Sequence, residues 1–128
     1  MEEAYRSHKR LWDNQKTVPS DSHKMVLFYA VECGLKYCYM RKEKIECTET
    51  SGNSKKSVTS FNHKFSDLLS ELQINATVPD IKKKGQRDIY ADELHQVWRY
   101  GKKLDENDER PCMIVLESIL NELNIKIG

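Results

Sequence analysis

Hydrophobic residues along this chain recur mostly at helical spacing. The clearest run lies between residues 23 and 44, where one helix face collects Leu27, Val31, Gly34, Leu35 and Cys38. Aromatic residues on its other sides, Phe28, Tyr29, Tyr37 and Tyr39, indicate a central helix buried on most of its surface. Glycine costs about 1 kcal/mol relative to alanine inside a helix, so we expect Gly34 to let another helix approach closely.

Four further amphipathic segments accompany this helix. A first helix is predicted over residues 2–16, a third from about 60 to 72, a fourth from 88 or 91 to 103, and a closing helix over 113–123. Their apolar positions are Ala4, Leu11 and Trp12; Phe61, Phe65, Leu68, Leu69 and Leu72; Leu94, Val97 and Trp98; and Met113, Leu116, Ile119, Leu120 and Leu123.

Polar segments separate these helices. Residues 48–60 predict a mobile loop, residues 75–85 a connection, and residues 105–111 a charged loop. Strand-like alternation is confined to the short end over residues 125–127. The sequence therefore predicts a single all-α domain over residues 1–128, a helical bundle of about five helices.

The composition is that of a globular chain with a strongly charged surface. Of the 128 residues, 32% are charged and 38% are hydrophobic, and 21 Lys and Arg residues nearly balance 20 Asp and Glu residues. The formal net charge of +1 provides no global argument for nucleic-acid binding, which leaves local basic patches as the alternative.

The N-terminus and the cysteines point to a compartment. The segment Met1–Arg6 is charged from its start, which argues against a signal peptide, and the longest apolar-rich run is too short to span a bilayer. The four cysteines, Cys33, Cys38, Cys47 and Cys112, have no metal-ligand spacing. We therefore expect a cytoplasmic protein with reduced thiols, without membrane contact, metal or cofactor.

Two ionisable residues interrupt the central apolar run. Glu32 and Lys36 lie one helical turn apart, in the favourable order for an ion pair. The simpler interpretation is a partly buried structural pair. The alternative is a polar pocket between helices, in which Glu32 and Lys36 meet Arg99, His63 and Asp67.

Two histidines have a charged neighbour one helical turn away. His63 precedes Asp67 by four residues, and a carboxylate at that spacing can orient an imidazole for acid–base chemistry. His95 precedes Arg99 in the same way, and such a pair can grip a phosphate. The simpler alternatives are a histidine bonded within its own helix turn and an ordinary helix surface with Trp98 in the core.

A basic run precedes the fourth helix. Together with Arg99, the residues Lys82, Lys83, Lys84, Arg87, Lys102 and Lys103 are candidates for binding the phosphates of RNA or a nucleotide. A solvated run of charges is the commoner explanation of such a pattern.

Three segments, in this order, carry a family resemblance. Residues 29–36, Tyr-Ala-Val-Glu-Cys-Gly-Leu-Lys, resemble a core helix that often reads A-E-x-x-L-K, and residues 62–69 resemble an H-x-L-x-x-L helix. Residues 97–101, Val-Trp-Arg-Tyr-Gly, look like an R-Y region that carries a signature arginine. The chain thereby resembles HEPN domains, small helical domains of prokaryotic toxin, defence and nucleotidyltransferase-associated systems.

The resemblance implies a function, but the sequence departs from the catalytic motif of the family. Ribonucleases of this family carry an arginine followed by four to six residues and a histidine, whereas no histidine follows Arg99, and Arg87 stands one residue too far from His95. Because histidine is the side chain best suited to transfer protons near neutral pH, we expect a non-catalytic binding or scaffolding component of a toxin–antitoxin or phage-defence system. It would recognise RNA, a nucleotide or a protein partner from the same operon.

Other interpretations stay open beside this one. The resemblance also implies a homodimer paired through long helices, with Trp12, Tyr37 and Tyr39 as candidate apolar contacts. A diverged metal-independent ribonuclease would use Arg99 with His95 or His63. A third possibility is a small helical interaction module unrelated to the family.

Overall fold

All regular structure in the described part of the chain is helical. The computed structural model describes residues 1–15, 20–43, 65–82, 88–100 and 104–127. Within these ranges the elements are α1 (Glu2–Gln15), α2 (Asp21–Glu43), α3 (Phe65–Glu71), the 3-10 turn η2 (Ala91–Glu93), α4 (Leu94–Arg99) and α5 (Glu106–Ile127). This confirms the predicted all-α class. The loop predicted over residues 48–60 lies outside the described residues.

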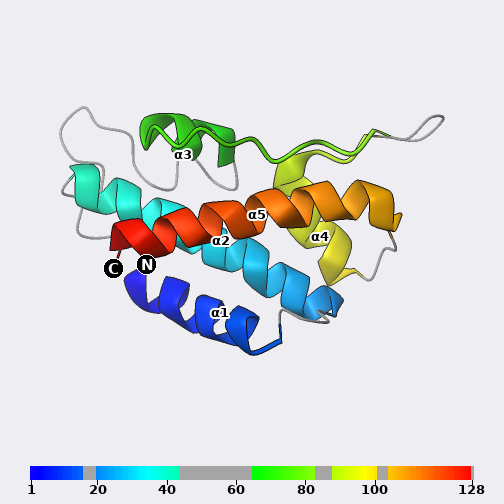
Figure 1. The fold of residues 1–128 in the computed structure, drawn as a ribbon, viewed down its shortest axis with the longest axis horizontal. Helices are drawn as coiled ribbons and strands as arrows, with labels where there is room; N and C mark the ends of the chain where they lie inside the picture. Colours follow the sequence, from blue (N-terminus) through cyan, green and yellow to red (C-terminus); the bar gives the residue numbers. More distant parts are fainter. Residues whose placement is uncertain (16–19, 44–64, 83–87, 101–103, 128) are drawn as a thin grey trace.

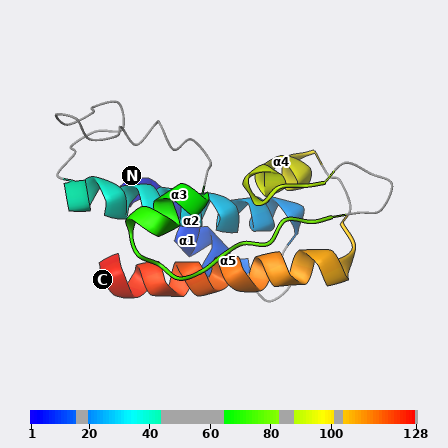
Figure 2. The same cartoon turned by 90° about the horizontal axis from the view of Figure 1, so that it is seen from above.

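The helices are arranged around α2. In Figure 1, α1 lies along one side of α2 and α5, while α3 and the extended chain that follows it lie along the opposite side. Figure 2 shows α5 running beside α2 over nearly its whole length. Each of the helices α1, α3, α4 and α5 packs against α2. The central position predicted for this helix is therefore correct, and it follows from the apolar residues on most of its sides.

Helix α5 begins earlier than the sequence analysis predicted. The segment 105–111 is the start of this helix and not a loop, because Asp105 caps it by accepting the backbone N–H of Asn107 at its Oδ1, 2.9 Å away. The acidic residues of the first turn stabilise the helix further, because their negative charges lie at the positive end of the helix dipole. Pro111 lies inside the helix, near its N-terminal end. The end over residues 125–127 is also helical and not strand-like.

The buried face of α1 differs in two positions from the prediction. Leu11 is 51% exposed, while Tyr5, which the pattern did not single out, is 1% exposed and packs into the core. Trp12 and Tyr39 are both buried inside the protomer. These two side chains therefore cannot provide the dimer contacts predicted for them, and Tyr37 is partly engaged by donating a hydrogen bond to Glu2 Oε1 at 3.1 Å.

Gly34 marks the place where three helices meet. A Cβ atom at this position would lie 2.8 Å from Leu123 Cδ1 of α5 and 2.8 Å from Tyr5 Cδ1 of α1. Both contacts are too short for carbon atoms, so only glycine lets α1 and α5 approach α2 this closely. The close approach predicted for Gly34 is confirmed.

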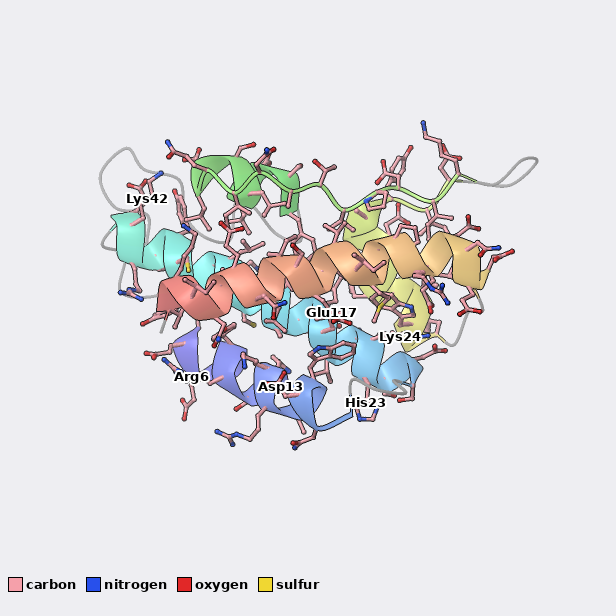
Figure 3. The ribbon with its side chains drawn as sticks, viewed as in Figure 1. Arg6, Asp13, His23, Lys24, Lys42 and Glu117 are labelled. Atoms are coloured by element: carbon pink, nitrogen blue, oxygen red, sulfur yellow. The ribbon has the colours of Figure 1, made fainter. Side chains whose placement is uncertain are left out.

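A charged cluster joins α2, α4 and α5 near the N-terminal end of α2. Lys24 Nζ lies 2.6 Å from Glu109 Oε1, and Trp98 Nε1 donates to Glu109 Oε2 at 3.0 Å. Figure 3 shows Lys24 near one end of α2 and Lys42 near the other. The buried indole N–H thereby obtains the acceptor that it requires.

Candidate functional site

The predicted pair on α2 is formed inside the bundle. Glu32 is 6% exposed, and its Oε2 lies 3.9 Å from Lys36 Nζ. Burial lowers the pKa of Lys36 below its usual value. Both side chains are largely covered by protein, which favours the structural interpretation of this pair.

The predicted pair on α4 is divided between core and surface. His95 is 6% exposed, and its ring centroid lies 4.8 Å from that of Phe28 and 6.0 Å from that of Tyr29, both on α2. Arg99, one turn later, is exposed, with its guanidinium carbon 5.9 Å from the ring centroid of Tyr100. The imidazole and the guanidinium therefore lie in different environments.

The other predicted site residues are placed only in part. Asp67 on α3 and Lys82 after it are both exposed. His63, Lys83, Lys84, Arg87, Lys102 and Lys103 lie outside the described residues. The pocket predicted from Glu32, His63 and Arg99, and most of the predicted basic patch, therefore stay predictions.

A cavity that the sequence analysis did not predict lies where α2, α3 and α5 end. We call it the basic pocket. Its volume is about 390 Å³, and its lining consists of Cys38, Arg41 and Lys42 from α2, Glu71, Leu72 and Gln73 from the end of α3 and the turn after it, and Lys126 from α5. Lys42, at the far end of α2 in Figure 3, marks its position. The described residues of this lining include three cations and one carboxylate.

The cations of the basic pocket contact a helix end, an aromatic ring and a thiol. Lys42 Nζ donates to the backbone oxygen of Glu71 at 2.5 Å, where it satisfies a terminal carbonyl of α3. The Arg41 guanidinium lies 5.5 Å from the Tyr37 ring centroid. Burial raises the pKa of the Cys38 thiol, while Arg41 and Lys126 act to lower it. A negative charge on this side of the pocket is therefore favoured by both cations.

A second cavity lies on the other side of the turn that ends α3. We call it the α3 hollow. Its volume is about 460 Å³, and it is lined by Phe65, Ser66, Leu69 and Ser70 of α3, by Ile74, Asn75, Ala76, Thr77, Val78 and Asp80 of the extended chain, and by Tyr90 and Ala91. The backbone groups of Ile81 and Ile89 exchange hydrogen bonds of 2.7 and 2.8 Å, which bring the two chain segments together.

Neither cavity has a local sequence signal. Arg41 and Lys42 at the end of α2, and Lys126 at the end of α5, have the pattern of cations that stabilise helix C-termini. Their convergence depends on two helices that are distant in the sequence ending side by side. The serines, Asn75 and Thr77 of the α3 hollow resemble ordinary surface positions.

The described part of the chain was also searched for metal sites and membrane-spanning helices, and the sequence was compared with known proteins. Within the described ranges, no three His, Cys, Asp or Glu side chains gather as a metal site. No helix in these ranges is long and apolar enough to cross a membrane. Comparisons with protein-family models, curated proteins and solved structures find no match for this chain.

Proposed function

We propose that this chain is a non-catalytic binding module that holds the phosphate of an RNA or a nucleotide in the basic pocket. The resemblance to HEPN domains suggests a role in a prokaryotic toxin–antitoxin or phage-defence system of the cytoplasm. Free thiols at Cys33, Cys38 and Cys112 suit that compartment.

The charge and size of the basic pocket carry this proposal. Among the described lining residues, three cations, Arg41, Lys42 and Lys126, outnumber one carboxylate, that of Glu71. A volume of about 390 Å³ is enough space for a small ligand. Arginine adds a planar fork of donors that matches phosphate oxygens. The helix C-termini offset part of the positive charge, and Lys42 is already bonded to Glu71, so Arg41 and Lys126 are the two cations most available to a ligand.

The surroundings of the basic pocket favour binding over cleavage. Among the described residues that line it there is no histidine. Among the described lining residues, the one protonatable group besides the cations and the carboxylate is the Cys38 thiol. Burial raises the pKa of this thiol, which leaves little thiolate near neutral pH. His95 packs against Phe28 in the core, so we do not assign it to this pocket.

A salt-dependent binding measurement tests the proposal. The double variant Arg41→Gln/Lys126→Gln is compared with the wild type by fluorescence anisotropy on a labelled single-stranded RNA. If each cation neutralises one phosphate, the slope of log affinity against log salt falls by about 1.4, or about 0.7 for each contact. Loss of two exposed cations elsewhere, in Arg10→Gln/Arg110→Gln, is the matched control.

The result can contradict the proposal in two ways. If the wild-type chain binds neither RNA nor a nucleotide at low salt, the basic pocket has no such ligand. If the control variant loses as much affinity and slope as the pocket variant, binding follows total charge and not this pocket.

The predicted homodimer remains part of the proposal, with a different surface. Because Trp12 and Tyr39 are buried, the exposed apolar residues of α5, Ile114 at 60% and Ile125 at 81%, are better candidates for the contact. Light scattering on the purified chain tests this, since a dimer has close to twice the chain mass of 15.0 kDa. A single-chain mass at micromolar concentration would contradict it.

A further inference from the structure

The α3 hollow combines an apolar wall with a polar rim. Phe65, Leu69, Ile74 and Val78 are all buried, with exposed fractions between 2% and 6%. The rim residues Ser66, Ser70, Asn75 and Thr77 are exposed and carry hydroxyl or amide groups. A cavity of about 460 Å³ has the size of a small-molecule site.

The charge of the hollow is opposite to that of the basic pocket. Among the described residues that line it, none is a cation, and Asp80 is the only charged one. A phosphate is therefore unfavourable there, while an uncharged ring that offers hydrogen-bond donors is favourable. Tyr90 at the rim is 50% exposed, so its ring has a face on which a flat ligand can stack.

One short stretch of chain lines both cavities. Ser70 and Ile74 face the hollow, while Glu71, Leu72 and Gln73 between them face the basic pocket. Gln73 has a φ of 57°, and this left-handed residue turns the chain between the two. The two linings therefore meet at a single turn of the chain, and a nucleic-acid strand that crosses this turn would contact both.

Asp80 determines which ring atoms the hollow can recognise. Its Oδ1 accepts the backbone N–H of Ala91 at 2.8 Å. A carboxylate oxygen accepts hydrogen bonds, and because Asp80 is exposed, its second oxygen is accessible to a donor from a ligand. Cytosine, adenine and guanine present an exocyclic amino group, whereas uracil presents a carbonyl oxygen in its place. The ring N–H donor of uracil, at N3, lies between two carbonyl oxygens that repel a carboxylate.

We propose that the α3 hollow holds a base of the same RNA whose phosphate lies in the basic pocket, and that Asp80 selects bases with an amino group. This inference rests on the proposed function, because it assumes the phosphate contact. Single-stranded nucleic acid is recognised in this way when unstacked bases lie on aromatic rings and their edges bond to side chains.

The substitution Asp80→Asn tests the selection without removing the structural bond. The amide oxygen still accepts the N–H of Ala91, while the second position becomes an NH2 donor. Anisotropy with labelled pentanucleotides of cytidine, adenosine and uridine then measures a ratio of affinities. For the wild type we expect the first two to bind about three- to tenfold more tightly than oligouridine, the effect of one hydrogen bond. In Asp80→Asn this preference is lost or reversed.

Two further variants show whether the effect on base preference is specific to the α3 hollow. Glu122→Gln removes the same charge from an exposed site on α5 that does not line the hollow, and it should leave the preference unchanged. Tyr90→Leu should weaken binding of all three pentanucleotides at least about fivefold through lost stacking, while inorganic pyrophosphate binds as it does to the wild type. This second variant tests the hollow even if Asp80→Asn fails to fold.

The outcomes separate this inference from the proposed function. If pentanucleotides bind through Arg41 and Lys126 but without base preference, or with a preference that Asp80→Asn and Tyr90→Leu leave intact, the hollow is not the base site. The proposed function then still stands. If the variant Arg41→Gln/Lys126→Gln also binds normally, the phosphate contact itself is wrong.

Discussion

The substitution Gly34→Ala tests the packing at the centre of the bundle. The added methyl group would lie 2.8 Å from both Leu123 Cδ1 and Tyr5 Cδ1, and 3.1 Å from Tyr5 Cε1. Leu123 is 0% exposed and Tyr5 is 1% exposed. Neither side chain can move away without displacing other core atoms, so α1 or α5 must shift outward.

Two opposing effects determine the size of the change. Alanine stabilises a helix by about 1 kcal/mol relative to glycine, whereas an extra methyl group in a well-packed core costs about 1 to 3 kcal/mol. The second effect is larger here because both contacts are with buried side chains. We expect Gly34→Ala to lower the free energy of unfolding by about 1 kcal/mol, which corresponds to about 4 °C in Tm for a domain of this size.

Urea unfolding followed by circular dichroism measures this change. Ser118→Ala, at an exposed position of α5, is the control and should raise stability by up to about 0.5 kcal/mol through helix propensity alone. Shortening the opposing side chain in Gly34→Ala/Leu123→Val should cost less than the sum of the two single changes. The reasoning is refuted if Gly34→Ala is more stable than the wild type, or if the two changes are additive.

Two further measurements address other parts of the structure. Glu109→Ala should lower the free energy of unfolding by about 2 to 3 kcal/mol, since the buried Trp98 N–H loses a charged acceptor. Glu106→Ala removes an exposed ion pair and should change the free energy of unfolding by less than about 0.5 kcal/mol. Equal losses for the two variants in urea unfolding would contradict this. Iodoacetamide should alkylate Cys38 slowly at pH 8 and faster as the pH rises above 9, because burial raises the pKa of this thiol. Cys112, with a pKa of about 11 and 0% exposure, should stay unmodified. Peptide mass spectrometry measures both reactions. Pyrophosphate should slow the reaction at Cys38, and an unchanged rate would show that the basic pocket holds no phosphate.

Helix positions followed from the sequence wherever a long apolar face was present. The central helix was predicted over residues 23–44 and spans Asp21–Glu43. The start of α5 was missed because a charged segment containing Pro111 has the composition of a loop, while the cap at Asp105 and the dipole of the first turn make it helical.

The candidate site shows a different limit. His95 and Arg99 were placed on one helix face because four residues make slightly more than one turn. Yet the ring of His95 packs on Phe28 of α2, whereas Arg99 is the last residue of this short helix and is exposed. In contrast, Glu32 and Lys36 stay paired because α2 is covered along this whole stretch.

The sequence by itself determined the helical class, the central role of α2 and most of the residues that face the core. These properties depend on the spacing of neighbours along the chain, which the sequence contains directly. The tertiary structure alone decided that Arg41 and Lys42 meet Lys126, and that one turn of chain separates the basic pocket from the α3 hollow. Contacts of this kind depend on where helices that are distant in the sequence end after packing. Local periodicity does not encode the positions of those helix ends relative to one another.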